Sequence, residues 1–217
     1  NPETQQTARK QTGSFYTPRE IVQYMVDESL VAHLKRTVGN ELEGEYRKLL
    51  DYADNETSLT EQQKLAIMQS LYNCKILDPA CGSGAFPVGV LQQMVHILKQ
   101  IDPDNSRCKN MLLQFAIDET SEAYLNSTAE ERREAVADIE RAFDENVNYP
   151  DYARKLHLIE NCIYGVDIQP IAIQISKLRF FISLVIDQKR NDNPADNFGI
   201  RPLPNLEAKF VAANSLL

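Results

Sequence analysis

Several features are missing from this 217-residue sequence, and each absence excludes a class of protein. No apolar run approaches the roughly 20 residues that a membrane-spanning helix needs, and the N-terminus has no signal-peptide pattern. The four cysteines form no C-x-x-C pair, which indicates reduced thiols rather than disulfides or zinc ligands. The three histidines lie far apart in the sequence. We therefore expect a cytoplasmic protein with no membrane partner and no bound metal.

Basic charge is also scarce. The chain has 23 Lys and Arg residues against 31 Asp and Glu residues, a formal net charge of −8. A protein surface that holds a nucleic-acid backbone is normally rich in Lys and Arg. An extensive nucleic-acid contact is therefore not expected on these residues themselves.

The most informative stretch is a glycine-rich turn between an expected strand, 75–78, and an expected helix. Apolar residues fall on one face of that helix, at Val88, Leu91, Met94, Val95, Leu98 and Ile101. Strand, glycine turn and helix form the opening of a nucleotide-binding βαβ unit, in which the helix N-terminus offers N–H groups to an anion. The turn itself reads Asp78-Pro79-Ala80-Cys81-Gly82-Ser83-Gly84-Ala85-Phe86.

A second strand is expected at 162–167, and it ends in a carboxylate, Asp167. An acidic residue at this place in a nucleotide-binding fold accepts both ribose hydroxyls of a nucleoside, usually about 20 residues after the glycine turn. Here Asp167 follows Asp78 by 89 residues (167 − 78). Turn signals at both ends of 102–160, with helical patterns between them, predict a helical insertion. The alternative for Asp167 is a simple helix-capping carboxylate.

A third strand pattern, 208–212, leads to Asn214 and Ser215. The carboxyl ends of parallel strands meet at one edge of a sheet, and ligands bind there. We therefore expect Asp78, Asp167 and Asn214 to gather at that edge. A long helix that opens at Pro170 precedes the third strand, and its apolar residues share one face, namely Ile171, Ile175, Leu178, Ile182 and Val185.

The N-terminal part of the chain is expected to be helical. Thr17, Pro18 and Glu20 have the order of a capping box with proline at the first helical position, and Tyr16 and Ile21 have the spacing of a hydrophobic staple. The helix is predicted to bury Val22, Met25, Val26, Ser29 and Leu30 and to end near 38–39. On these grounds alone, 15–18 need be no more than a helix start. A second capping box is predicted at Thr60 and Gln63.

The chemistry of the glycine turn favours one ligand class over another. A dinucleotide would use G-x-G-x-x-G, but the third glycine is absent and Pro87 follows instead. Asp78 places a carboxylate where it would face the ligand, which suits an ammonium group better than two phosphates. S-adenosyl-L-methionine has such an ammonium group, together with a carboxylate that a helix N-terminus can receive.

Four motifs now resemble those of γ-class N6-adenine DNA methyltransferases, in the same order. Motif X is matched by Phe15-Tyr16-Thr17-Pro18, and motif I by residues 78–86. Motif II is matched by Tyr164-Gly165-Val166-Asp167-Ile168-Gln169-Pro170, and motif III by Asn214-Ser215-Leu216. The sequence looks most like the large bacterial restriction–modification proteins, including type IIG-like enzymes. The resemblance implies an α/β, Rossmann-like S-adenosylmethionine-dependent methyltransferase fold, with an N-terminal helical region (1–73) and a partial cofactor-binding domain (74–217).

The resemblance also implies a role for each matching residue. Thr17, with Phe15, Tyr16 and Pro18, would close over the methionine end of the cofactor. Asp78 would lie near its ammonium group, and Asp167 would bind the ribose hydroxyls. The turn would be lined by Pro79, Ala80, Cys81, Gly82, Gly84 and Phe86. Ile168 would pack on the adenine ring, and Asn214, beside Ser215, would hydrogen-bond the adenine amine, where the family often has Asp.

The catalytic motif IV of that family, Asn/Asp-Pro-Pro-Tyr/Phe, has no counterpart, because no Pro-Pro pair occurs in the sequence. No catalytic residue is therefore expected on this chain. The resemblance implies the cofactor-binding portion of a site-specific DNA adenine-N6 methyltransferase from a bacterial restriction–modification or phage-defence system. Such a portion would be inactive alone and would reach double-stranded DNA through other parts of its parent. A methyltransferase that acts on a protein or small molecule, and a non-catalytic scaffold domain, stay open as alternatives.

Overall fold

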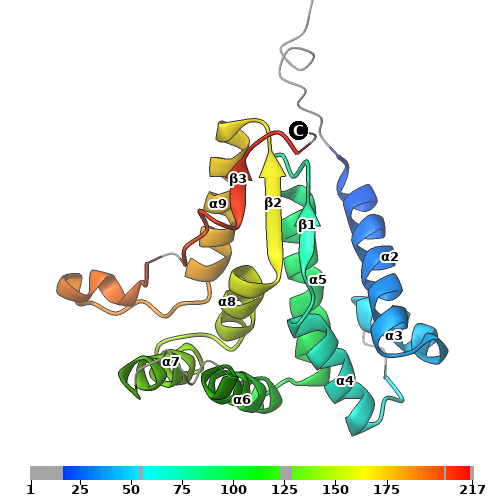
Figure 1. Cartoon of the computed structure of the whole chain (residues 1–217), viewed down its shortest axis with the longest axis horizontal. Coiled ribbons are helices and arrows are strands. Elements are labelled where there is room, and N and C mark those ends of the chain that lie inside the picture. The colour runs from blue at the N-terminus through cyan, green and yellow to red at the C-terminus, as the bar shows by residue number, and fades with distance from the viewer. Residues whose placement is uncertain (1–16, 54–55, 123–128, 203, 216–217) are drawn as a thin grey trace, which may run out of the picture.

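The computed structural model describes residues 17–53, 56–122, 129–202 and 204–215, and it is a mixed α/β structure (Figure 1). The elements in chain order are α2 (Arg19–Thr37), η1 (Asn40–Leu42), α3 (Glu43–Leu50), α4 (Glu61–Tyr72), β1 (Ile76–Asp78), α5 (Ala85–Ile101), α6 (Ser106–Glu122), α7 (Ala129–Ala142), α8 (Asp151–Asn161), β2 (Ile163–Asp167), α9 (Pro170–Val185), η2 (Pro194–Gly199) and β3 (Phe210–Ala212).

The three strands form one parallel sheet in the order β1-β2-β3. Ile76 is paired with Ile163, and Gly165 with Phe210. All three strands therefore end at the same edge, at the upper end of the molecule in Figure 1. The predicted positions of the strands and their parallel arrangement are confirmed.

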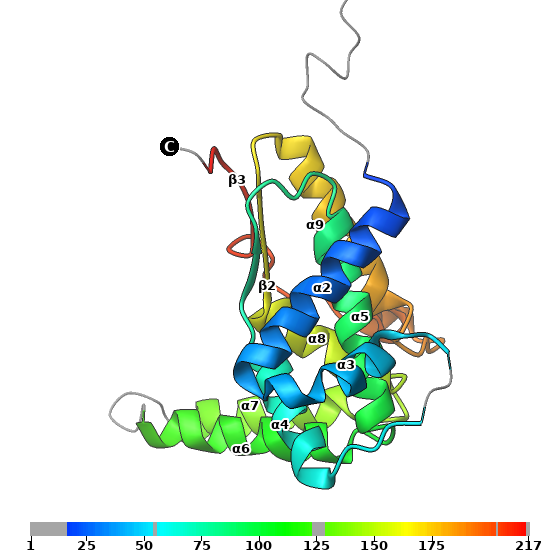
Figure 2. The same ribbon diagram turned by 90° about the vertical axis from the view of Figure 1, so that its right-hand side faces the viewer.

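The two faces of the sheet differ. Helices α5 and α9 pack on one face, where Ile163 and Phe210 are almost completely buried. The other face carries Leu77 and Val211, which are 61% and 42% exposed. No helix among the described residues covers that face (Figure 2). Parallel sheets are usually buried on both faces, so this sheet has an uncovered apolar side.

The N-terminal helix α2 packs against α5 where α5 has a glycine. A Cβ atom at Gly89 would lie only 3.1 Å from Val22 Cγ1, so the absence of a side chain lets the two helices approach closely. The helix ends at Thr37, as predicted. The core-facing residues recur mainly every fourth position and are Val22, Val26, Leu30, Val31 and Leu34. The prediction that Met25 and Ser29 are buried was wrong, because both lie on the exposed side of this stripe.

One predicted helix cap is confirmed and the other is wrong. Thr60 and Gln63 form a complete capping box at the start of α4. At α2, however, the cap residue is Pro18, whose extended ψ of 147° lets its carbonyl accept from the N–H groups of Ile21 and Val22. Thr17 is therefore one residue too early to cap the helix, and no side-chain cap is formed. Tyr16, the other half of the predicted staple, lies outside the described residues.

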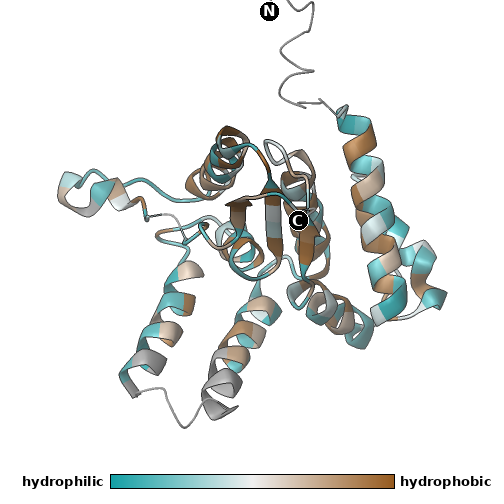
Figure 3. Cartoon of the chain, turned by 45° about the horizontal axis from the view of Figure 1, so that its top comes forward, coloured by the Kyte–Doolittle hydropathy of each residue, from teal (hydrophilic) through white to brown (hydrophobic). Residues whose placement is uncertain are grey.

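The segment predicted as a helical insertion has two parts. Helices α6 and α7 pack against each other and extend away from the sheet (Figures 1 and 3). Helix α8 instead contacts α5, α9 and β2, and its Leu158 and Ile159 are fully buried. The domain boundaries given above stay a prediction, but α8 is part of the central core.

Helix α9 begins at Pro170 as predicted, but the apolar face predicted from its sequence points away from the core. The side chains that pack on the sheet and the neighbouring helices are instead Ile173, Ser176, Lys177, Phe180 and Leu184. The predicted stripe of Ile171, Ile175, Leu178 and Ile182 is 43–66% exposed.

Candidate cofactor-binding site

The glycine turn lies at the edge of the sheet where the strands end, and hydrogen bonds with β2 and with the segment after β3 hold it there. The Cys81 N–H donates to the Val166 carbonyl over 2.9 Å. Ser215 Oγ donates to the Pro79 carbonyl, also over 2.9 Å, and so joins the segment after β3 to the turn. Asp78, Asp167 and the segment with Ser215 thus lie at one edge, as the strand pattern predicted.

Asp78, at the end of β1, has one carboxylate oxygen in use and one free. Its Oδ1 accepts from the Ala80 N–H over 3.0 Å, whereas Oδ2 is buried and has no hydrogen-bond partner among the residues that the structure describes. Burial raises the pKa of the Asp78 carboxyl above its ordinary value, and the nearby charge of Asp167 raises it further. A cationic donor placed against Oδ2 would satisfy this oxygen and reverse the shift in pKa.

Asp167, at the end of β2, holds two segments together. Its Oδ2 accepts from the Gly82 N–H over 2.9 Å, and its Oδ1 accepts from the Gln169 N–H over 2.8 Å. The second contact holds the backbone just before α9, but Asp167 is not a helix cap, because the cap residue of α9 is Gln169 and no side-chain cap bond is formed there. The first contact ties the glycine turn to β2. A carboxylate can accept about four hydrogen bonds, which leaves capacity for ligand hydroxyl groups.

The two glycines of the turn are needed for different reasons. Both have positive φ, +54° at Gly82 and +85° at Gly84. A Cβ atom at Gly82 would meet nothing within 4 Å, so its backbone faces open space. A Cβ atom at Gly84 would lie 2.4 Å from Ser176 Oγ, so this glycine lets the turn pack directly on α9. Gly84 is also the cap residue of α5, whose first N–H groups face the same edge.

Helix α9 supports the turn from behind, through residues that the motif analysis did not select. Ser176, which is fully buried, donates to the Gly82 carbonyl over 3.4 Å, and Arg179 Nη1 donates to the Ser83 carbonyl over 3.1 Å. Cys81 is buried beside them, and burial raises the pKa of its thiol to about 11. This thiol is therefore neutral near pH 7 and suited to packing rather than to nucleophilic chemistry.

The remaining predicted site residues are distributed unevenly. Phe15 and Tyr16 lie outside the described residues. Thr17 and Pro18 stand at the start of α2, at the same end of the molecule as the turn (Figure 1), but no hydrogen bond within the described part of the chain joins them to it. Four residues at the edge are exposed, namely Pro79, Ala80, Ile168 and Asn214, whereas Phe86 is half-buried and packs against the core.

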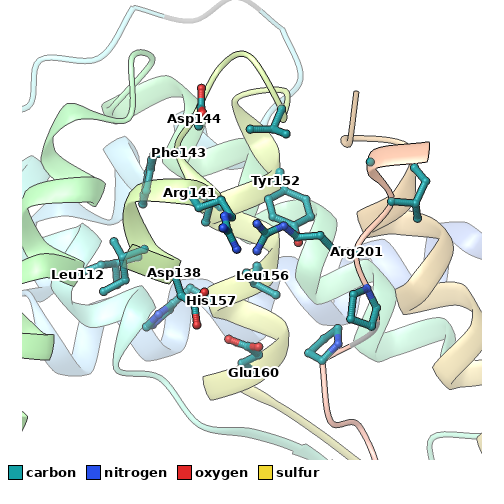
Figure 4. Close-up of a pocket in the computed structure, with 18 of the residues that line it drawn as sticks. Leu112, Asp138, Arg141, Phe143, Asp144, Tyr152, Leu156, His157, Glu160 and Arg201 are labelled. Atoms are coloured by element: carbon teal, nitrogen blue, oxygen red, sulfur yellow. The ribbon is translucent and has the colours of Figure 1, made fainter. Parts of the chain in front are cut away.

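A hollow of about 960 Å³ lies elsewhere, between α7, α8 and residues of the stretches 195–202 and 204 (Figure 4). It shares no lining residue with the glycine turn. Arg141 and Arg201 point toward each other in it, and Asp138 and Glu160 also line it, so its walls carry both signs of charge. Its His157 is kept neutral, since burial lowers the pKa of the imidazole to about 4. This hollow is therefore separate from the sheet edge, where the unpartnered carboxylate oxygen of Asp78 and the open glycine lie.

Two further searches of the described residues were negative. No three His, Cys, Asp or Glu side chains are close enough together to hold a metal ion. No helix in this part of the chain has both the length and the apolar character needed to cross a membrane.

Comparison with known proteins gives a relative in an archaeon. The chain is 29% identical, over 96% of its length, to a Methanocaldococcus jannaschii protein named "Putative type II restriction enzyme and methyltransferase". This similarity relates the chain to restriction–modification methyltransferases. The chain spans 15% of the length of that protein. No protein-family model and no solved structure matches the sequence.

Proposed function

We propose that this chain binds S-adenosyl-L-methionine and is the cofactor-binding portion of a site-specific DNA adenine-N6 methyltransferase of a restriction–modification system. One observation carries the proposal: the buried, unpartnered Oδ2 of Asp78 lies beside an open glycine turn at the ends of parallel strands. The name of the M. jannaschii relative supports the methyltransferase class and the restriction–modification context. The choice of adenine N6 is supported by the order of the four motifs.

The residues present fit this cofactor. Asp78 Oδ2 would accept from the ammonium group, and the first N–H groups of α5 would receive the carboxylate. Asp167 would accept from the ribose hydroxyls while it keeps the turn tied to β2 through Gly82. Ile168, which is 68% exposed, and Asn214 would flank the adenine ring. When bound, the cofactor supplies an electrophilic methyl group on its sulfonium.

The contribution of this chain to the reaction would be to hold and orient the donor. Positioning of two reactants supplies a large part of catalysis in such transfers. The group that grips the flipped base belongs to motif IV, for which this chain has no residues. We therefore expect the 217-residue chain alone to transfer no methyl group to DNA, and a longer parent protein to form N6-methyladenine, measured by nucleoside analysis of digested DNA. A different methylated nucleoside would contradict the adenine assignment.

Ligand binding tests the proposal directly. The chain is titrated with S-adenosylhomocysteine, and its melting temperature is followed up to millimolar ligand. We expect a stabilisation of about 3 kcal/mol at a hundredfold excess of ligand over Kd. Asp167→Ala should remove it, whereas Asp138→Asn, in the separate hollow, should not.

The two alternatives predict different results in the same titration. A non-catalytic scaffold domain predicts no stabilisation of the wild-type chain at millimolar ligand. A methyltransferase for proteins or small molecules predicts ligand binding here but no methylated base in the DNA treated with the longer parent.

A further inference from the structure

Helix α9 exposes an unusual amount of aliphatic surface. Ile171, Ile175, Leu178 and Ile182 are 66%, 43%, 53% and 50% exposed, and Ile186, one turn after Ile182, is 63% exposed. The opposite side of the helix is packed into the core. A helix that is apolar all round is normally buried on all sides. We call the row from Ile171 to Val185 the α9 seam.

The spacing within the α9 seam indicates the shape of what covers it. Ile171, Ile175, Leu178, Ile182 and Val185 follow one another at intervals of four, three, four and three residues. This alternation is the heptad pattern by which one helix packs along another. The charged residues of α9 do not disturb the seam, because Lys177 pairs with Glu207 and Arg179 donates to the Ser83 carbonyl. The occupant that fits is an apolar helix face.

We infer that an amphipathic helix from the same polypeptide, encoded outside these 217 residues, packs along the α9 seam. The relative supports a longer polypeptide, since the stretch similar to this chain is 15% of its length. The docked helix would lie next to the helix that supports the glycine turn, because α9 contacts that turn through the buried Ser176 and the exposed Arg179.

The size of the seam favours an occupant from the same polypeptide over a second copy of this chain. A helix of 16 residues is about 24 Å long, which is little more than two heptads. A stable interface between separate proteins needs about 800 Å² on each partner, more than a single short helix pair supplies. A segment tethered in the same chain is present at an effective concentration of about a millimolar, so a small seam is enough.

Cysteine labelling tests the inference. All four cysteines of the 217-residue chain are buried, and burial raises the pKa of each thiol, so a surface cysteine added to this chain reacts selectively with a maleimide. In the intact gene product, the rate at each added cysteine is followed by mass spectrometry of the peptide that contains it. Leu178→Cys reports on the seam. Leu65→Cys on α4, at a leucine that is 41% exposed, is the matched control. Both variants are made in the intact gene product and in the 217-residue chain, and each is checked by circular dichroism.

In the intact protein, the thiol of the Leu178→Cys variant should react at least about tenfold more slowly than that of Leu65→Cys. The docked helix must first detach from α9 before the maleimide can reach the thiol. In the 217-residue chain the two rates should be similar at every protein concentration. Similar rates in the intact protein would overturn the inference, as would a gene that encodes no further residues. Slowing at 178 in the short chain as its concentration rises would assign the seam to a second copy. Ile175→Cys repeats the test if Leu178→Cys does not fold.

Discussion

At the scale of single residues, the buried carboxylate of Asp78 destabilises the free protein but is suited to bind a cationic group. Its Oδ2 is buried without a partner, and burial and Asp167 together raise the pKa of its carboxyl. An arrangement that costs stability in the free protein is typical of a binding site prepared for a ligand of opposite charge. Asp167, one strand away, has a different role because both of its oxygens already accept hydrogen bonds.

Replacement of the Asp78 carboxylate should stabilise the free chain and weaken its binding of the ligand. The pKa of Asp78 in the folded state is raised above its ordinary value of 3.8. The folded chain therefore loses stability as the pH rises from 3.8 through the raised pKa, because the buried carboxyl must ionise. Asp78→Asn should therefore raise the melting temperature of the free chain by a few degrees at pH 7 and have little effect at pH 3. The same change should weaken binding of S-adenosylhomocysteine about tenfold or more, measured by calorimetry. Unchanged affinity would contradict the role of Oδ2.

His157 should make the stability of the chain depend on pH. Burial lowers the pKa of its imidazole from 6.5 to about 4, so the unfolded state takes up the proton first as the pH falls. The stability contributed by neutral His157 is complete above pH 6.5 and is lost between pH 6.5 and 4. Between pH 7 and pH 5, the free energy of unfolding measured in urea should fall by about 2 kcal/mol less in His157→Gln than in the wild type. Parallel losses in the two proteins would show that His157 is not responsible.

At the scale of elements, the glycine turn depends on helix α9 as much as on its own sequence. Gly84 is in contact with Ser176, and the Gly82 and Ser83 carbonyls accept from Ser176 and Arg179. The turn is therefore shaped by a helix that begins more than 80 residues later in the chain. The open side of the turn is at Gly82, where no atom lies within 4 Å of a Cβ position.

Alanine at the two glycines should give different results. Gly84→Ala combines a φ of +85° with a Cβ atom 2.4 Å from Ser176 Oγ, and should cost about 2–4 kcal/mol in urea unfolding. Adding Ser176→Ala should recover part of that loss. Gly82→Ala has only the backbone strain, about 1 kcal/mol, but its methyl group enters the open space of the candidate site. It should fold and bind S-adenosylhomocysteine poorly; normal binding would exclude the ligand from this side of the turn.

At the scale of the whole molecule, the described part of the chain leaves two apolar surfaces uncovered, and the sequence has a net negative charge. One face of the sheet is uncovered at Leu77 and Val211, and the α9 seam is a second uncovered surface. The formal net charge is −8. These properties are compatible with the function proposed above, in which other parts of a longer protein would cover the apolar surfaces and contact DNA.

The charge of the chain leads to a simple prediction about DNA. The 217-residue chain should show no binding to double-stranded DNA in fluorescence anisotropy at about 150 mM salt, because nonspecific affinity requires several Lys or Arg contacts with phosphates. The cofactor analogue should not change this result. Micromolar binding by the chain alone would show a basic surface that the net charge conceals.

Much of this architecture follows from the sequence, because its causes are local. The strand that ends in Asp78, the helix after the glycine turn and the capping box of Thr60 and Gln63 depend on hydrogen bonds and side-chain spacing within a few residues. The order of strand ends also predicted that Asp78 and Asp167 would meet at one edge. The predicted roles of these residues toward a cofactor stay predictions.

The tertiary structure decided what local patterns leave open. Helix α9 is apolar on all sides, so its sequence cannot show which side faces the core, and packing on β2 and β3 selected Ile173, Phe180 and Leu184. The orphaned oxygen of Asp78 and the contact between Gly84 and Ser176 likewise depend on segments far apart in the chain. Sequence determined where the elements form, since that is governed by neighbouring residues. Only the fold decided which atoms are buried without partners, since burial is a property of the whole packed molecule.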